Sequence, residues 1–269
     1  MNTNSNVRAT SASAIGARHQ HAGRNGQDAA ATFVGPLAAQ AVAEAGHGVA
    51  VAVVCDGCSS GASSEVGARL GARWFAERLG QALANGAEVE DRATWEAARR
   101  DVAARLRSVA ELGELATSSA IERAIDADAV HELLLFTIVA AAITPDGAAV
   151  WALGDGAYGC DGAIHVLGPF AENAPPYLAY DLLGDPREAH FEVLSSAQRI
   201  VIATDGAADL EYDLAAFGTT STANPDALRR RLALLARSEE RIAWGEGRVH
   251  RSPAILQDDC AVAILERLA

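Results

Sequence analysis

Alternating and β-branched runs of apolar residues mark nine segments of the chain that we predict to be β-strands. They lie near 8–16, 30–34, 48–55, 133–144, 148–158, 163–167, 189–194, 199–204 and 260–266. Between the third and fourth runs the apolar residues adopt helical spacing, which predicts helices over about 63–85 and 92–112. A third helix is predicted after Asn224, which serves as its N-cap, with Pro225 as its first residue.

The order of these elements favours an α+β fold. Three strands precede two long helices, and a series of strands, one helix and a last strand follow, so strands and helices do not alternate as they do in a parallel doubly wound sheet. We therefore expect two stacked antiparallel β-sheets with helices on their outer faces, a four-layer αββα sandwich. The polar segments 211–226 and 244–257 are predicted to be loops. We expect a single domain over 1–269, with residues 1–7 as a disordered tail.

Composition and charge exclude several classes of partner. The longest apolar run, at 133–144, is shorter than the roughly 20 residues of a membrane-spanning helix. The first residues have no apolar core or cleavage-like site, so we expect a cytoplasmic monomer with reduced cysteines. The formal net charge of −13 disfavours nucleic acid and anionic membranes, since both reward a basic surface. The same charge is compatible with bound cations.

Five Asp-Gly pairs differ in where they stand relative to the strands. Asp146-Gly147 and Asp161-Gly162 join adjacent predicted strands, as hairpin turns do. Asp56-Gly57 and Asp205-Gly206 instead end apolar runs and lead into polar or helical segments. Asp155-Gly156 lies inside a strand pattern, where a short acidic residue is least expected. The last three pairs therefore need an explanation other than a turn.

Two further segments place aspartates beside apolar runs, namely Asp28 and the pair Asp258-Asp259. Any one of these aspartates alone is most simply a turn or cap residue. Carboxylates that converge at the end of one core repel each other unless a cation lies between them. Carboxylates, carbonyls and water are the ligands that Mg²⁺ and Mn²⁺ prefer. The set therefore predicts a two-metal site.

These segments form an ordered series of motifs. The first pattern, H-x-x-x-G-x-x-x-Q-D, is matched by His19, Gly23, Gln27 and Asp28. The second, D-G-x-x-S followed by S-E-x-G-A, is matched by Asp56, Gly57, Ser60 and residues 64–68. Three short motifs follow in order, namely Gly154-Asp155-Gly156, Thr204-Asp205-Gly206 and Asp258-Asp259. The ordered set, which spans 19–266, resembles the metal-dependent type 2C (PPM) serine/threonine protein phosphatases, in a bacterial branch. The fold implied by this resemblance agrees with the one predicted from the pattern.

The resemblance also implies roles for individual residues. Asp56 would bridge two Mn²⁺ or Mg²⁺ ions, with the Gly57 carbonyl on one ion and with Asp205 and Asp258 on the other. Asp155 would help to hold a weaker third ion, and Asp28 would bind through water. A hydroxide bridging the ions would attack the phosphate of phosphoserine or phosphothreonine. Asp56 and Asp205 would thus be catalytic through the metals.

The sequence departs from the family at two positions. Cys58 stands where a histidine often follows the D-G pair as a proposed general acid, and Arg24, the candidate phosphate-binding arginine, is one residue off its usual spacing from Asp28. His19 is a further candidate, either as a catalytic proton donor or as a phosphate contact. These departures leave open a second hypothesis, that of a pseudophosphatase that binds phosphoproteins without hydrolysing them.

A third hypothesis rests on thiol chemistry, because Cys55 and Cys58 form a C-x-x-C motif. Zinc would need a second pair of ligands, and Cys160 and Cys260 are isolated in the sequence. Finally, residues 172–182 resemble a segment in family members whose loci also encode a kinase and a von Willebrand A-type protein. The expected partner is therefore a phosphorylated protein linked to such a kinase.

Overall fold

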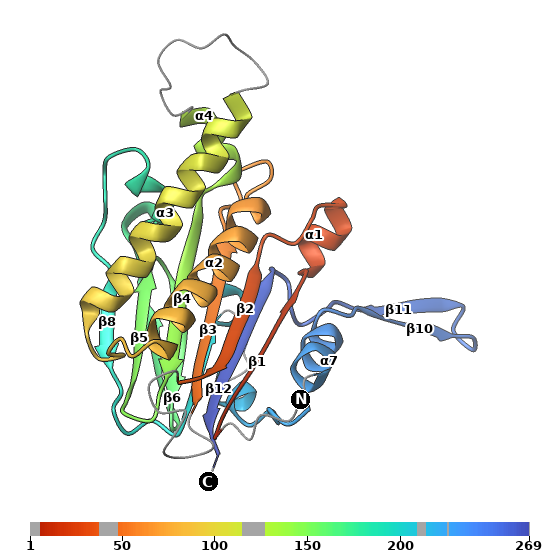
Figure 1. Cartoon of the computed structure of the whole chain (residues 1–269). Helices are drawn as coiled ribbons and strands as arrows, with labels where there is room; N and C mark the ends of the chain where they lie inside the picture. Colours follow the sequence, from red (N-terminus) through yellow and green to blue (C-terminus); the bar gives the residue numbers. More distant parts are fainter. Residues whose placement is uncertain (1–5, 38–47, 115–126, 209–213, 225, 269) are drawn as a thin grey trace.

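The computed structural model describes residues 6–37, 48–114, 127–208, 214–224 and 226–268 (Figure 1). The strands are β1 Val7–Ala14, β2 Ala29–Pro36, β3 Gly48–Gly57, β4 Phe136–Ile143, β5 Ala148–Leu153, β6 Gly156–Cys160, β7 Ala163–Leu167, β8 His190–Val193, β9 Arg199–Ala203, β10 Glu239–Ala243, β11 Arg248–Ser252 and β12 Cys260–Arg267. The α-helices are α1 Ala17–Ala22, α2 Glu65–Ala84, α3 Arg92–Glu114, α4 Ala127–Leu133, α5 Asp205–Ala208, α6 Leu214–Gly218 and α7 Asp226–Leu235. Two 3₁₀ turns, η2 Ala171–Asn173 and η3 Leu178–Asp181, lie between β7 and β8.

Two five-stranded antiparallel sheets form the centre of the fold. The first sheet has the order β2-β3-β4-β5-β8 and the second the order β1-β12-β9-β6-β7. In β3, Val51 and Val53 face one side while Ala52 and Val54 face the other, because side chains alternate along a strand. The second set packs against the second sheet in a shared core. The two stacked antiparallel sheets expected from the sequence are confirmed.

Helices cover the outer face of each sheet. Trp151 of the first sheet stacks on Phe75 of α2, with ring centroids 5.0 Å apart, in a core that also includes α3. On the second sheet, Val262 of β12 packs with Leu232 of α7 and Phe217 of α6. The layers are therefore helices, sheet, sheet and helices, which confirms the predicted αββα sandwich.

The strand predicted over 148–158 is two strands that belong to different sheets. β5 ends at Leu153 in the first sheet, and β6 begins at Gly156 in the second. The chain crosses between the sheets at Gly154 and Asp155, and it does so with φ of 106° at Gly154 and 124° at Gly156. Only glycine adopts such angles without strain, so the G-D-G sequence allows the crossing and places Asp155 at it.

Other boundaries also differ from the prediction. The segment 133–144 begins as the end of α4, and its strand starts at Phe136. The predicted loop 244–257 contains β11, and the predicted loop 211–226 contains α6, although residues 211–213 and 225 lie outside the described residues. Neither α1 nor β10 was predicted, because α1 has no buried residue and β10 has four exposed residues out of five, so neither shows a core-facing pattern.

The two predicted hairpins are confirmed: residues 146–147 connect β4 to β5, and residues 161–162 connect β6 to β7. The third predicted helix is α7, whose Asp226 N–H donates to the side chain of Asn224 at 3.1 Å. Residues 1–5 of the expected tail lie outside the described residues, whereas Val7 is buried as the first residue of β1. No helix in the described part of the chain has both the length and the apolar character needed to cross a bilayer.

Candidate metal centre

The aspartates singled out in the sequence meet at one end of the two stacked sheets. Asp56 and Gly57 end β3, and Asp28 lies just before β2, whose Ala29 pairs with Cys55 of β3. The second sheet contributes aspartates after β9 and before β12, and Asp155 comes from the crossing between the sheets. The cavity that they share has a volume of about 340 Å³, and its walls include all six predicted metal-binding residues: Asp28, Asp56, Gly57, Asp155, Asp205 and Asp258.

The residues that the structure describes compensate the burial of these carboxylates only in part. Asp28 is only 6% exposed, and its Oδ2 accepts a hydrogen bond from the Thr204 hydroxyl at 2.6 Å, but its Oδ1 is buried without a hydrogen-bond partner among the described residues. The pKa of Asp28 is raised to about 7, chiefly by burial and also by the charges of Asp259 and Asp205. A buried carboxylate oxygen without a donor is what a cation or a metal-bound water would satisfy.

Asp56 and Asp155 show the same excess of negative charge. Burial raises the pKa of Asp56 well above its usual range, and the neighbouring charges of Asp28, Asp205 and Asp155 raise it further. Burial also raises the pKa of Asp155, whose Oδ1 is likewise buried without a partner among the described residues. Oxygen ligands at this density suit hard divalent cations such as Mg²⁺ and Mn²⁺, so the residues present fit the predicted ions.

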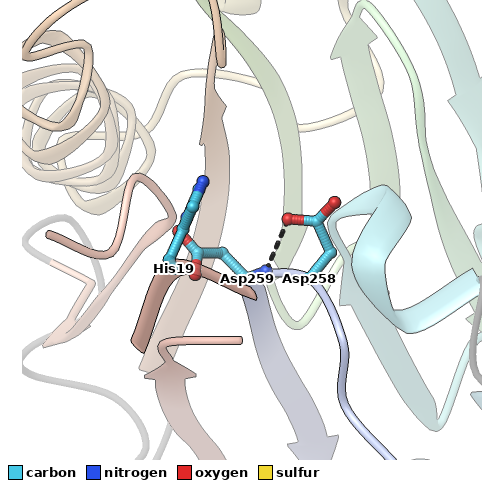
Figure 2. Close-up of side chains that lie close together, drawn as sticks. All are labelled: His19, Asp258 and Asp259. Atoms are coloured by element: carbon cyan, nitrogen blue, oxygen red, sulfur yellow. Dashed lines mark hydrogen bonds and ion pairs between the residues drawn. The ribbon is translucent and has the colours of Figure 1, made fainter. Parts of the chain in front are cut away.

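Asp258 and Asp259 have different surroundings (Figure 2). Asp259 is buried and accepts hydrogen bonds from the backbone N–H of Gly16 at 2.8 Å, from that of Gln27 at 2.6 Å and from His19 Nδ1 at 2.8 Å. Asp258 is half exposed, and its Oδ1 accepts only the N–H of Asp259, at 2.9 Å. That Asp258, and not Asp259, binds the ion stays a prediction. We keep it because three hydrogen-bond donors already occupy the carboxylate of Asp259.

His19 lies in the cavity wall, and Asp259 holds its ring. Because Nδ1 bonds to Asp259, Nε2 is the ring nitrogen left for a ligand, and Figure 2 shows that nitrogen directed away from Asp259. The ligand atoms of His19, Asp258 and Asp259 lie within 4.8 Å of one another. Since Asp259 already accepts three hydrogen bonds, we interpret this cluster as an anchored histidine beside the half-exposed carboxylate of Asp258, whose Oδ2 forms only a long ion pair of 3.9 Å with Arg18.

Arg24 is the predicted site residue that does not line the cavity. It lines a neighbouring pocket of about 220 Å³, and its Nη2 donates to the carbonyl of Ser59 at 3.4 Å. The two pockets share Gln27, whose amide donates to Ser64 Oγ at 2.8 Å. The arginine is therefore beside the aspartates and not among them.

The structure adds residues that sequence reasoning missed. Thr204 bonds Asp28 and also accepts the N–H of Ala261 at 2.9 Å, so it ties the two central strands of the second sheet to the first. Tyr177 lines the cavity, and its hydroxyl donates to Cys58 Sγ at 3.3 Å. Thr204 stood in a quoted motif without a role, whereas nothing in the sequence indicated that Tyr177 would reach the aspartates.

The placement of the cysteines argues against a thiolate metal site, although the pKa of one of them, Cys58, is lowered. Burial raises the pKa of Cys58, but hydrogen bonds from Ser60 and Tyr177 outweigh it, and the net direction is downward. Cys55 is buried with a raised pKa, and all four cysteines are free thiols. Among the residues that the structure describes, the one cluster with metal-ligand spacing contains no cysteine.

Comparisons with known proteins give a consistent result. The family model described as protein phosphatase 2C matches residues 15–241. Similar solved structures include a serine/threonine phosphatase of S. agalactiae (16% identity, covering 97% of this chain and 99% of that chain, TM-score 0.57), and PppA of Pseudomonas aeruginosa, a regulatory component of its T6SS (15% identity, 97% of each chain, TM-score 0.56).

A third similar structure is the catalytic domain of the phosphatase PstP in complex with two manganese ions (17% identity, covering 98% of this chain and 99% of that chain, TM-score 0.53). At these identities the structural likeness shows the fold alone. A search of curated proteins found no match.

Proposed function

The chain belongs to the protein phosphatase 2C family of metal-dependent serine/threonine phosphatases, and on that premise we propose that it hydrolyses phosphoserine and phosphothreonine in proteins with two Mn²⁺ or Mg²⁺ ions. The observation that carries the proposal is the single cavity lined by Asp28, Asp56, Asp155, Asp205 and Asp258, with two carboxylate oxygens buried and unpartnered within the described residues. When bound, the ions lower the pKa of a shared water molecule and neutralise the charge of the phosphate.

The residues of the chain have distinct tasks in this proposal. Asp56 and the Gly57 carbonyl would hold one ion, and Asp205 and Asp258 would join Asp56 at the other. Asp28, held by the hydroxyl of Thr204, would bind through water, and Asp155 would contribute to a weaker third ion.

His19 serves the substrate. Its ring is oriented by Asp259, and Nε2 contacts the phosphate or gives a proton to the departing seryl or threonyl oxygen. Cys58 stands where many family members have a histidine. The Tyr177 hydroxyl donates a hydrogen bond to its Sγ, and we propose that these two side chains form a second polar contact for the substrate in the cavity wall.

The physiological setting is a further part of the proposal. A phosphatase of this kind would reverse the action of a protein kinase in bacterial signalling, in the cytoplasm. The similarity of residues 172–182 to family members beside a kinase and a von Willebrand A-type protein supports a phosphorylated partner of that kinase as substrate. PppA, one of the proteins of similar fold, regulates a secretion system in its own organism.

The test of the enzymatic proposal is turnover by the purified protein. We expect hydrolysis of p-nitrophenyl phosphate and of a phosphothreonine peptide only with Mn²⁺ or Mg²⁺, and a loss of at least about 100-fold in Asp56→Ala and Asp205→Ala. Asp146→Ala is the matched control, because Asp146 also precedes a glycine but lies in the β4–β5 hairpin. An absence of turnover with either ion contradicts the proposal. So does a turnover of Asp56→Ala and Asp205→Ala that equals that of the active control Asp146→Ala.

A pseudophosphatase is the second candidate function, and two observations favour it. Cys58 stands in the cavity where the family often has histidine, and Arg24 lies in the neighbouring pocket. Calorimetric titration separates the two candidates. Stoichiometric Mn²⁺ binding without hydrolysis of any phosphopeptide would favour the regulator over the enzyme.

A further inference from the structure

A β-hairpin projects from the body of the molecule just before the last aspartates of the cavity. We name residues 239–252 the arm; it consists of β10 and β11, which form a two-stranded sheet of their own (Figure 1). Nine of its ten strand residues are exposed. Because an isolated two-stranded hairpin is at best marginally stable in water, an arm of this length is expected to have something to pack against.

The two faces of the arm differ in chemistry. Residues directly opposite each other share a face, so Ile242 and Val249 form an apolar pair on one side. They are 52% and 53% exposed, and Trp244 at the turn is 84% exposed. The Glu240–Arg251 ion pair lies on the same side as Ile242 and Val249. The other face holds Arg241 opposite His250, with Glu239 before them and Arg248 beyond them. Neither arginine side chain has an ion pair or hydrogen bond with any residue that the structure describes.

Exposed apolar residues are concentrated in this part of the chain. Five of the twelve exposed large hydrophobic residues in the described part of the chain lie between 234 and 255, namely Leu234, Ile242, Trp244, Val249 and Ile255. The arm holds three arginines and three glutamates, so it carries no net charge, whereas the whole chain has a net charge of −13. Arg251 is paired with Glu240 at 2.8 Å, which leaves Arg241 and Arg248 as the arginines of the arm without an ion pair among the described residues. Clustered exposed apolar residues mark interaction surfaces, and these two arginines favour acidic side chains in the partner.

The base of the arm is fixed to the candidate metal centre. Asp258 follows the last arm residue by six positions. In that connection, the carbonyls of Leu256 and Gln257 accept the N–H groups of Ala17 and Arg18 at 3.1 and 3.0 Å, at the start of the helix that carries His19. The Leu256 N–H donates to Leu235 at the end of α7. A protein held by the arm therefore has a defined position relative to the cavity.

We propose that the arm docks the phosphoprotein substrate, and that this substrate has apolar side chains flanked by acidic ones at the docking segment. This inference rests on the proposed phosphatase function and adds the chemistry of the substrate. Trp244, Ile242 and Val249 contact the apolar side chains, while Arg241 and Arg248 pair with the acidic ones. Docking raises the local concentration of the phosphorylated residue at the cavity and leaves the chemical step to the metal centre.

The experiment compares one large acidic substrate with one small substrate. Phosphorylated β-casein is the acidic phosphoprotein probe, and p-nitrophenyl phosphate is too small to reach the arm. We expect the ratio of kcat/KM for phosphocasein to kcat/KM for p-nitrophenyl phosphate to fall about tenfold in Trp244→Ala and in Arg248→Glu, because loss of one docking contact of about 1.4 kcal/mol changes affinity tenfold.

Matched controls use exposed residues elsewhere, Val166→Ala on β7 and Arg100→Glu on α3, which should leave the ratio unchanged. Salt should lower the wild-type ratio and affect Arg248→Glu less. If wild type hydrolyses neither substrate, the proposed function fails and the docking inference with it. If both are hydrolysed and the arm variants keep the wild-type ratio, only the inference is overturned. A dimer in sedimentation that the arm variants dissociate also overturns it, since a second copy then covers the arm.

Discussion

Asp28 shows at the scale of one residue what the cavity requires. Its carboxyl is buried beside other carboxyls, and its pKa is raised from 3.8 to about 7. In the ion-free protein, the folded form therefore retains a proton that the unfolded chain releases once the pH exceeds about 4. Stability from this group is fully present below pH 4 and is lost as the pH rises toward 7. The site favours a neutral acid until a cation is bound.

We predict that the ion-free protein is more stable at pH 5 than at pH 7.5, by a few kcal/mol, since a pKa shift of one unit corresponds to about 1.4 kcal/mol. The raised pKa values of Asp56 and Asp155 act in the same direction. Urea denaturation in EDTA measures the effect. Asp28→Asn, which keeps an oxygen for the Thr204 hydroxyl, should reduce the pH dependence. Greater stability at pH 7.5 than at pH 5 in EDTA would contradict this account.

Individual residues also show how far the sequence predicts the site. Asp56 and Asp205 were predictable because each places a charge at the end of an apolar strand run. Burying a charge at the edge of a core is costly unless the charge is paired or binds a cation. The choice between Asp258 and Asp259 came from a family resemblance, since neighbouring aspartates look alike until their donors are known. The position of Arg24 depends on the turn at Gly23, where φ is 65°, and a sequence pattern does not specify such a turn.

At the scale of elements, α2 depends on glycines that let it lie close to the first sheet. A Cβ built at Gly71 would lie 2.4 Å from the ring of Phe136, the first residue of β4. The glycines weaken the helix itself by up to about 1 kcal/mol each relative to alanine. Close packing of α2 on the first sheet, whose strand β3 carries Asp56 at its end, compensates for this loss of helix stability.

We expect Gly71→Ala to destabilise the protein by roughly 1–3 kcal/mol, because overpacking a dense core costs more than the gain in helix propensity. Gly245→Ala is the control, since nothing lies within 4 Å of the Cβ built there. Chemical denaturation gives both values. A stability of Gly71→Ala equal to or above that of wild type would show that α2 tolerates a wider spacing from β4.

Elements were predictable in proportion to their length and burial. The first eight residues of β3 form an unbroken buried run and α2 is twenty residues long, so the sequence places both within a few positions. The run 148–158 reads as one strand because buried strands of both sheets have the same apolar composition, and only the positive φ values at Gly154 and Gly156 separate them. The arm escaped prediction because its exposed strands carry no buried face.

At the scale of the whole molecule, the candidate metal centre lies where the two sheets meet. Asp28 and Asp56 belong to the first sheet, Asp205 and Asp258 to the second, and Asp155 to the crossing between them. The proposed ligands come from segments far apart in the sequence, so metal binding would require the assembled sandwich. Conversely, an ion that binds only the folded chain stabilises the whole fold.

We therefore predict that Mn²⁺ raises the melting temperature of the protein. An ion concentration 100 times its Kd stabilises the folded state by about 2.7 kcal/mol, which for a chain of this size corresponds to roughly 5–10 °C. Because the ion displaces protons from carboxyls with raised pKa values, Mn²⁺ should bind more weakly, and shift the melting temperature less, at pH 5.5 than at pH 7.5.

The mutations that test this effect are the same as those for turnover, with a readout that does not need activity. Asp56→Ala and Asp205→Ala should melt at a temperature that Mn²⁺ leaves unchanged, while Asp146→Ala should respond as wild type does. Removal of Asp56 or Asp205 also relieves repulsion in the ion-free cavity, so in EDTA these variants should melt at or above the wild-type temperature. Variants that melt well below wild type in EDTA would mean that the aspartates stabilise the fold themselves, and that no cation is needed to explain their burial.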